Sequence, residues 1–327
     1  MQKKVLSGMR PTGKLHLGHW VGALSNWVSL QESARCFFMV ADWHALMSEY
    51  KNTYQIKDIM LDNVADWLAW GIDPEKSVIF IQSEISEHLE LFMILSFLTP
   101  LGWLSRCPTF KEQIKQLKEK EINTHAFLGY PVLQAADILL YKANFVPVGE
   151  DQLPHLEITR EIVRRFHFIY GKEVFVEPQP FLTKIPRFLG LDGRKMSKSY
   201  NNFIALDEDD DSIKRKVLSM FTDPQRLRRQ DPGHPGICNV FSYYKVFKPE
   251  LEEEVYSWCT KSIKGCKECK ADLAAIIVGL VAPGRERKKK FLNDKDLVYN
   301  ILKEGGRKAR IFAEETLREV KKAMGLW

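Results

Sequence analysis

Short apolar runs alternate with amphipathic stretches through the first half of the chain. The apolar runs have the length of buried strands, and the stretches that follow three of them repeat apolar residues at helical spacing. The strand-like runs are residues 3–9, 36–41, 77–81 and 145–148, and the helical ones are residues 20–30, 56–71 and 88–98. Strands that alternate with helices predict an α/β fold with a doubly wound, Rossmann-like parallel sheet. Ligands of such sheets bind beyond the carboxyl ends of the strands.

The pattern changes near residue 200. An acidic patch at residues 207–211 is followed by mostly helical patterning with few β-branched runs. We therefore expect an α/β domain over residues 1–200 and a smaller, all-helical C-terminal domain over residues 201–327, whose last helix is able to pack back on the first domain. Residues 99–125 interrupt the alternation and predict an insertion. Its charged segment, residues 111–121, is either a solvated helix face or a contact with a second subunit or RNA.

Composition narrows the class of protein. The chain has 327 residues and a formal net charge of +6, and most of the basic excess lies in the second domain. This balance favours a polyanionic partner, although a mild excess is also typical of a solvated surface. No apolar run is long enough to span a bilayer and the N-terminus lacks the pattern of a secretory signal, so we expect a soluble, cytoplasmic protein that does not bind membranes.

A first candidate for ligand binding is the segment from Arg10 to His19, between the first predicted strand and the first predicted helix. Free backbone N–H groups and the positive end of a helix dipole meet at such a place and suit phosphate. Gly18 lies between His16 and His19, and because it has no Cβ it allows a ligand to approach both imidazoles. A lone HxGH also occurs in many proteins that bind no nucleotide.

A second candidate is the glycine-containing loop from Leu191 to Ser199. It carries Lys195 and Lys198 among small hydroxyl side chains, and two lysines at this spacing can surround a pyrophosphate. Taken alone, a basic loop is most often an exposed surface segment. The loop therefore gains meaning only in combination with the first candidate.

A strongly apolar helix is predicted to start near Tyr130, with Pro131 in its first turn. Tyr130, Gln134, Asp137 and Tyr141 share one face of it. A carboxylate in so apolar a helix needs a partner that offsets its burial. Asp137 therefore belongs either to an internal hydrogen-bond network or to a pocket for a small ligand with a polar tip.

Four of the six cysteines lie close together in the second domain. They are Cys238, Cys259, Cys266 and Cys269, the last two at CxxC spacing. In a chain without an export signal, clustered cysteines favour a metal site over disulfides. The spacing alone leaves zinc and an iron–sulfur cluster both open.

With both loops considered, the chain resembles class I aminoacyl-tRNA synthetases. His16-Leu17-Gly18-His19 matches their HIGH signature, and Lys195-Met196-Ser197-Lys198-Ser199 matches KMSKS. Ala41 to His44, Ala135 to Tyr141 and Val146 to Gln152 resemble the tryptophanyl branch. The resemblance covers nearly the whole length and implies a tryptophan–tRNA ligase that activates L-tryptophan with ATP and transfers it to tRNA(Trp). It also implies Mg²⁺, an anticodon-binding role for residues 201–327 and a homodimer formed across residues 80–130.

Family roles carried to matching positions imply the following site residues. Catalysis is implied for His16, His19, Lys195 and Lys198. ATP binding is implied for Arg10, Pro11, Thr12, Gly18, His19, Gly149, Glu150, Asp151, Lys195, Met196, Ser197, Lys198 and Ser199. Tryptophan binding is implied for Asp137, as acceptor of the indole N–H, with Tyr130, Gln134, His44, Val146, Val148 and Gln152. The chain departs from many bacterial relatives at Arg10, where they have glutamine, and at Gln134, where they have methionine.

Other functions remain open at this stage. Archaeal-type tyrosyl-tRNA synthetases share a similar set around Asp137, but they place a tyrosine on the first strand where this chain has Leu6. A cofactor adenylyltransferase shares the HxGH loop, yet needs neither the second signature nor a helical domain. A synthetase-like protein that only binds RNA is a third possibility, and the intact signature residues count against it.

The resemblance also bears on the four cysteines. Their arrangement is similar to that of a bacterial branch of the family that holds a [4Fe–4S] cluster in the C-terminal domain. Zinc and unligated thiols are the alternatives. Lys264, Lys267 and Lys270 lie between or beside these cysteines and can offset thiolate charge or contact RNA phosphate.

Overall fold

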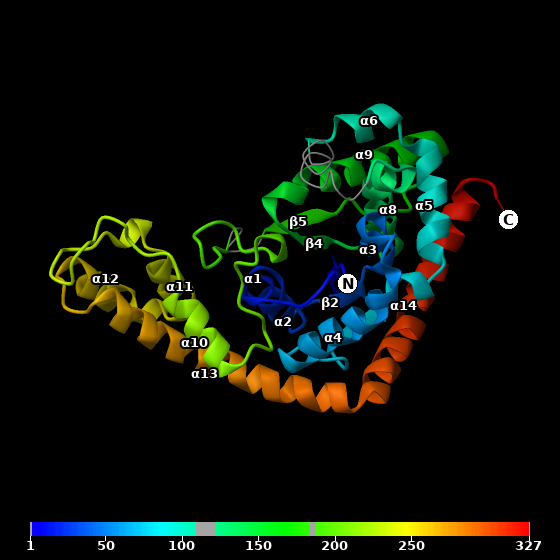
Figure 1. The fold of residues 1–327 in the computed structure, drawn as a ribbon. Helices are drawn as coiled ribbons and strands as arrows, with labels where there is room; N and C mark the ends of the chain where they lie inside the picture. The colour runs from blue at the N-terminus through cyan, green and yellow to red at the C-terminus, as the bar shows by residue number, and fades with distance from the viewer. Residues whose placement is uncertain (1, 109–121, 183–187, 327) are drawn as a thin grey trace. The chain divides into compact units, whose positions relative to one another are not determined.

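The computed structural model describes residues 2–108, 122–182 and 188–326. Contacts between residues divide the chain into two compact units. The first consists of Met1–Gly13, Ala23–Pro186 and Asp294–Trp327, and the second of Lys14–Gly22 and Arg187–Asn293. Figure 1 traces the elements in chain order from blue to red. The charged segment of the expected insertion, residues 111–121, lies outside the described residues.

The first unit is built on a five-stranded parallel sheet, which confirms the predicted α/β fold. Its strands run in the order β3-β2-β1-β4-β5, and every neighbouring pair is parallel. The strands are β1 (Lys4–Met9), β2 (Arg35–Val40), β3 (Ser77–Ile81), β4 (Phe145–Val148) and β5 (Gln179–Leu182). The first four match the apolar runs of the sequence. The edge strand β5 gave no such signal, because it is short, mostly exposed and contains a proline.

Helices alternate with these strands. In the first unit they are α2 (Ser25–Leu30), α3 (Asp42–Glu49), α4 (Ile56–Ala69), α5 (Glu87–Leu98), α6 (Leu101–Arg106), α8 (His125–Leu140), α9 (Leu153–Tyr170) and α14 (Lys295–Ala323), with short 3₁₀ turns η2 (Thr53–Gln55), η3 (Gln82–Glu84) and η5 (Glu150–Gln152). A π-helical turn, η1 (Trp20–Leu24), precedes α2. The core includes Trp27, stacked on Phe38 with ring centroids 4.4 Å apart.

Helix α8 begins earlier than the sequence pattern suggested. The hydroxyl of Thr124 accepts a hydrogen bond from the backbone N–H of Phe127, so Thr124 caps a helix that starts at His125. Pro131 therefore lies inside the helix, and its expected place in the first turn is wrong. Thr124 marks the true start of this helix, but the apolar periodicity begins only later and therefore predicted a later start.

Helix α14 closes the edge of the sheet at β3. Gly305 packs so closely on this strand that an added Cβ would collide with the carbonyl of Ile79. Helix α14 belongs to the first unit, together with the sheet. A covered edge strand cannot pair with another chain.

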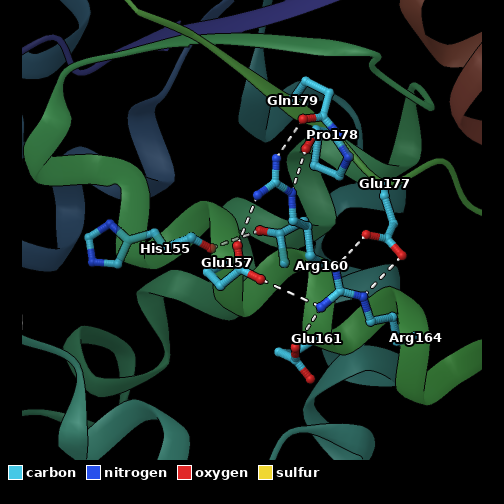
Figure 2. Close-up of polar contacts among 9 residues, drawn as sticks. His155, Glu157, Arg160, Glu161, Arg164, Glu177, Pro178 and Gln179 are labelled. Carbon is cyan, nitrogen blue, oxygen red and sulfur yellow. Dashed lines mark hydrogen bonds and ion pairs between the residues drawn. The ribbon is translucent and has the colours of Figure 1, made fainter.

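Helix α9 is joined by two arginines to the segment that leads into β5, as Figure 2 shows. Arg160 donates to the carbonyl of Pro178 and to the side chain of Gln179, both at 2.9 Å. Arg164 donates to both carboxylate oxygens of Glu177, at 3.1 and 2.8 Å. These contacts explain why so weak a strand as β5 is fixed beside β4.

The second unit is helical. It contains α1 (Leu17–His19), η6 (Lys198–Tyr200), α10 (Asp210–Leu218), η7 (Pro235–Ile237), α11 (Asn239–Phe247), η8 (Pro249–Leu251), α12 (Glu252–Thr260) and α13 (Cys266–Asn293). Helices α10 to α13 are coloured from green to orange in Figure 1. Within the described ranges, no helix combines the length and apolarity that crossing a membrane requires.

Candidate active site and thiol pocket

The predicted tryptophan-binding residues all lie in the first unit, and Asp137 is central among them. Its side chain projects from α8 and is 2% exposed. Oδ1 accepts hydrogen bonds from Gln82 Nε2 and His88 Nδ1, at 2.8 and 2.7 Å, and Oδ2 accepts one from His44 Nε2 at 2.8 Å. Burial raises the pKa of Asp137, but the hydrogen bonds from His44 and His88 bring it below its ordinary value. The carboxyl group is therefore ionised at neutral pH.

A tyrosine–histidine pair lies near the start of α9. The Tyr130 hydroxyl is hydrogen-bonded to the ring of His155, whose Nδ1 lies 2.9 Å from Gln152 Oε1. Burial lowers the pKa of His155 to about 4, so the ring is neutral. In that form Nδ1–H donates to Gln152 and the other nitrogen accepts from Tyr130. Gln152 is thus held in one orientation.

The other predicted residues of the pocket lie on β4 and α8. Val146 and Val148 are buried on β4, and Gln134 is half-buried on α8. Arg10 follows β1, and desolvation lowers its pKa against the opposing charge effects of Tyr130 and Glu49.

The two signature segments lie together in the second unit. The backbone N–H of Gly18 lies 3.2 Å from the sulfur of Met196, and Leu17 donates its N–H to the carbonyl of Ile204 at 3.0 Å. An added Cβ on Gly18 would come within 3.0 Å of the His16 ring and 3.4 Å of the Met196 sulfur. The glycine is therefore needed for packing between the signatures themselves. The predicted helix starts earlier than expected, at Leu17, with His16 as its N-cap.

The imidazoles of the first signature are close together and uncharged. The ring centroids of His16 and His19 lie 3.8 Å apart, and the His16 backbone N–H donates to His19 Nδ1 at 3.1 Å. Burial, with a smaller effect of Lys198, lowers the pKa of His16 to about 3, and the pKa of His19 is also well below its usual range. His16 Nδ1 is buried without a hydrogen-bond partner among the described residues. It is a polar atom that a ligand can satisfy.

The second signature loop is organised by a residue that sequence reasoning missed. Asn202 accepts from the backbone N–H of Ser197 at 2.8 Å and donates to Asp192 at 2.7 Å and to the carbonyl of Lys195 at 3.2 Å. Lys195 itself is exposed, and Lys198 begins a short 3₁₀ turn. The side chain of Ser199 lies outside the description.

Other predicted nucleotide-binding residues belong to the first unit. Pro11 is buried, and the Thr12 N–H donates to the Arg10 carbonyl at 2.9 Å. Gly149 precedes the turn η5, which carries Glu150 and Asp151, both exposed. Neither segment forms a closed site by itself.

The four clustered cysteines line one small pocket in the second unit. Cys238 precedes α11, Cys259 lies in α12, and Cys266 and Cys269 lie in the first turn of α13. Burial and the neighbouring cysteines raise the pKa of Cys269 to about 12. Within the described part of the chain, no group of three or more histidine, cysteine or acidic side chains is arranged to hold a single metal ion.

Two basic residues complete the thiol pocket. Arg226 points a guanidinium nitrogen at the Cys266 sulfur, 3.9 Å away, and Lys264 lies over the Trp258 ring, 3.5 Å from its centroid. An added Cβ on Gly233 would collide with the Cys259 sulfur. Arg226 lies 12 residues before Cys238, the first cysteine of the cluster, so the spacing of the cysteines did not point to it.

Sequence reasoning also missed Gln82, His88 and His155. Gln82 follows the carboxyl end of β3 directly, where ligands of parallel sheets bind, and that rule could have found it. His88 and His155 are fully buried histidines on amphipathic or apolar helices, and no local pattern distinguishes them from core residues.

Comparison with known proteins agrees with this geometry. The family model for tRNA synthetases class I (W and Y) matches residues 2–282. The chain is 49% identical to a tryptophan–tRNA ligase of Thermotoga maritima over 326 residues, covering 99% of each chain. It is 42% identical to a tryptophan–tRNA ligase of Ralstonia nicotianae, covering 99% of this chain and 98% of the relative.

A solved structure is also similar over the full length. It is a tryptophanyl-tRNA synthetase from Campylobacter jejuni complexed with ADP and tryptophan, with a TM-score of 0.89, 34% identity, and coverage of 99% of this chain and 100% of that one. The parallel sheet, the paired signatures and the matched length lead to one conclusion: this chain belongs to the class I tRNA synthetase family of the tryptophan and tyrosine enzymes.

Proposed function

We propose that this chain is a tryptophan–tRNA ligase. It activates L-tryptophan with ATP and transfers the amino acid to tRNA(Trp), in keeping with the function named for its full-length relatives. The observation that carries the proposal is the buried, ionised Asp137, an acceptor matched to an indole N–H. As a tRNA ligase, its expected place of work is the cytoplasm.

The amino-acid pocket is assigned to the first unit. Asp137 accepts the indole N–H, Val146 and Val148 contact the ring, and Gln152 and Tyr130 provide polar groups for the amino-acid end. His44 and Gln134 complete the lining. A site built to pair a substrate N–H rejects analogues without one by roughly 10⁴–10⁵, because its acceptor is otherwise left unpaired.

The reaction proceeds in two steps. A tryptophan carboxylate oxygen attacks the α-phosphorus of ATP, the bond to the bridging oxygen breaks, and pyrophosphate leaves. A ribose hydroxyl of the terminal tRNA adenosine then attacks the tryptophanyl carbonyl, and AMP leaves. Charge accumulates on phosphate oxygens in the first step, so catalysis needs an electrostatic clamp more than a general base.

The clamp is assigned to the signature residues of the second unit. His16 and His19 are neutral in the free protein, so they act as hydrogen-bond donors to phosphate or ribose oxygens rather than as cations. Lys195 and Lys198 supply positive charge for the departing pyrophosphate, and Mg²⁺ neutralises further phosphate charge when bound. The other nucleotide contacts are proposed for Arg10, Pro11, Thr12, Gly18, Gly149, Glu150, Asp151, Met196, Ser197 and Ser199.

Amino-acid-dependent exchange of pyrophosphate into ATP tests the function directly. We expect exchange with tryptophan and background rates with the other 19 amino acids. A response to tyrosine alone contradicts the tryptophan assignment, and no response combined with normal tRNA binding favours a non-catalytic protein. The buried Leu6 on β1, in place of a phenol-binding tyrosine, argues for tryptophan.

We further propose that Cys238, Cys259, Cys266 and Cys269 hold a [4Fe–4S] cluster. The donor set fits, because four thiols from three helical segments line one pocket beside Arg226. Four thiolates around one zinc ion lie about 3.8 Å apart, since each Zn–S bond is about 2.3 Å. A cubane instead binds each of four thiolates at a different iron. The cluster would act as a structural cross-link.

Anaerobic purification with iron and zinc analysis tests this assignment. We expect four iron atoms per chain, lost in Cys269→Ser and retained in the matched control Cys107→Ser, whose buried thiol lies in the first unit. One zinc and no iron per chain contradicts the cluster, and neither metal contradicts both.

Residues 1–200 are proposed as the catalytic domain and residues 201–327 as the anticodon-binding domain. We also propose a homodimer through α5 and α6, because Leu89, Met93 and Phe97 form an exposed apolar stripe at helical spacing on α5, and Leu101 at the start of α6 is exposed as well. Sedimentation of wild type and Phe97→Asp tests it: the wild type should sediment as a dimer and the variant as a monomer. A monomeric wild type contradicts the proposal.

A further inference from the structure

The hydrogen bonds around Asp137 have fixed directions. An ionised carboxylate only accepts, so His88 Nδ1 carries the proton in its 2.7 Å contact with Oδ1. The other ring nitrogen, Nε2, lies 2.8 Å from the Tyr141 hydroxyl. Burial keeps the pKa of Tyr141 well above its usual range, so this hydroxyl retains its proton. Tyr141 therefore holds the far side of the ring that donates to Asp137.

Gln82 is oriented by the same carboxylate. Because Asp137 Oδ1 accepts only, the amide must present its Nε2, 2.8 Å away, and its Oε1 faces elsewhere. Gln82 is 0% exposed, and its Oε1 has no hydrogen-bond partner within the described residues. A buried acceptor without a donor is costly, and a ligand that brings a donor removes the cost.

The network therefore presents acceptors to a ligand. Oδ1 of Asp137 already receives two donors, whereas Oδ2 receives only His44. The atoms with capacity left are Oδ2 and Gln82 Oε1, and both accept. An indole N–H is a donor only and matches them, while a phenol oxygen also needs a donor for its lone pairs.

We propose that Gln82, His88 and Tyr141 are positioning residues that commit Asp137 to accepting, with Oδ2 turned to the substrate, and so select the indole of tryptophan over the phenol of tyrosine. This inference deepens the proposed function and rests on it. None of the three residues needs to contact the reacting atoms. The effect of His88 and Tyr141 passes through the Asp137 carboxylate, and Gln82 acts both through that carboxylate and through its own Oε1.

Two substitutions at His88 separate positioning from simple packing. His88→Leu removes the donor to Asp137, and His88→Asn retains a donor near the place of Nδ1. In ATP–pyrophosphate exchange we expect His88→Leu to raise the KM for tryptophan about 10- to 100-fold, with the KM for ATP within about threefold. His88→Asn should stay within about fivefold of wild type for both substrates. Equal impairment in the two variants, or a parallel rise in both KM values, overturns the proposal.

The pH profile gives a second measure that a packing defect does not produce. Without His88, burial dominates and the pKa of Asp137 rises, so kcat/KM for tryptophan should gain an acid limb that neither wild type nor His88→Asn has. The other titratable groups in this region are His44 on α3 and Tyr141, with Glu87 on α5 and Arg310 on α14 acting on Tyr141. These groups are present in the wild type and in both variants. Only an acid limb that appears in His88→Leu and not in the others therefore supports the proposal. Identical profiles overturn the proposal.

Two further variants keep the test decisive if His88→Leu does not fold. Gln82→Met removes one donor to Oδ1 with little change in size, and it should raise the KM for tryptophan and narrow the preference over tyrosine. Tyr141→Phe should have a smaller effect in the same direction. Unchanged KM and preference in both overturn the proposal.

Calorimetric titration of tryptophan separates this inference from the proposed function. It reports on the pocket without catalysis. A wild type that binds tryptophan but shows no exchange contradicts the ligase function, and the difference between His88→Leu and His88→Asn can still be measured. A wild type active with tryptophan, with both variants alike, contradicts only the role of His88.

Discussion

The Asp137 network of the first unit and the signature loops of the second are built differently. Both carboxylate oxygens of Asp137 are already hydrogen-bonded, Oδ1 by the buried Gln82 and His88 and Oδ2 by the half-buried His44. In the second signature, by contrast, Asn202 holds the backbone while the Lys195 side chain is exposed. The first region is ordered in advance for recognition, where small errors in geometry cost specificity. The second keeps its charges available for phosphates that change during the reaction.

Removing the central carboxylate should have the largest effect. Asp137→Ala leaves three donors, two of them buried, without this acceptor and the indole N–H unpaired, so we expect kcat/KM for tryptophan to fall about 10³- to 10⁴-fold. ATP binding, measured by equilibrium dialysis, should change less than about threefold, because the loss is confined to the amino-acid pocket. An unchanged KM and kcat for tryptophan would remove Asp137 from its role.

Loss of a lysine from the second signature should lower kcat and leave the KM for tryptophan nearly unchanged. The effect should be somewhat smaller than that of Asp137→Ala. Lys195→Ala and Lys198→Ala are each expected to lower kcat about 10²- to 10³-fold, because they remove charge that stabilises the transition state. The KM for tryptophan should remain within about threefold. Lys195→Arg and Lys198→Arg, which retain the charge, are the matched controls. If the alanine variants shift the KM for tryptophan and spare kcat, the contrast between the two regions is wrong.

Much of the fold could be predicted because it depends on local signals. β3 and β4 were located to the residue by their apolar runs. The start of α8 and the edge strand β5 were missed, because one depends on a capping threonine and the other on the arginines of α9. Such contacts join residues that no short sequence window contains.

The candidate site shows the same limit. The signature motifs and Asp137 could be identified because their type and spacing carry the chemistry. Gln82 could have been found from its place directly after β3. His88 and Asn202 could not, since each acts only through partners elsewhere in the chain, 49 and 5 to 10 residues away. Even Asn202, the nearest in sequence, resembles an ordinary turn residue. Residues that position others are visible only once the chain is folded.

Loosening the backbone of the second signature should have an intermediate effect. Asn202→Ala removes the bonds to Ser197, Asp192 and the Lys195 carbonyl, so the loop loses its fixed shape without losing a charge. We expect kcat in the exchange assay to fall roughly tenfold, with thermal stability lowered and the KM for tryptophan unchanged. Asn202→Asp is the control, because it restores an acceptor for Ser197 but no donor. Full activity in Asn202→Ala would show that the loop is ordered by its substrates alone.

Lowering the pH should have the smallest effect, on the free energy of unfolding. It involves one histidine in each unit, His155 in the first and His16 in the second. The pKa values of His16 and His155 lie at about 3 and about 4 in the folded protein, below about 6.5 in the unfolded chain. Between these values the unfolded chain binds more protons, so the free energy of unfolding should fall as pH drops below about 6.5, by at most about 1.4 kcal/mol per pH unit for each histidine. Urea denaturation from pH 7 to 5 should show a shallower slope in His155→Gln, while the exposed His125→Gln serves as control. An unchanged slope in His155→Gln would mean that this ring is protonated in the fold, and its nitrogen could then not accept from the Tyr130 hydroxyl.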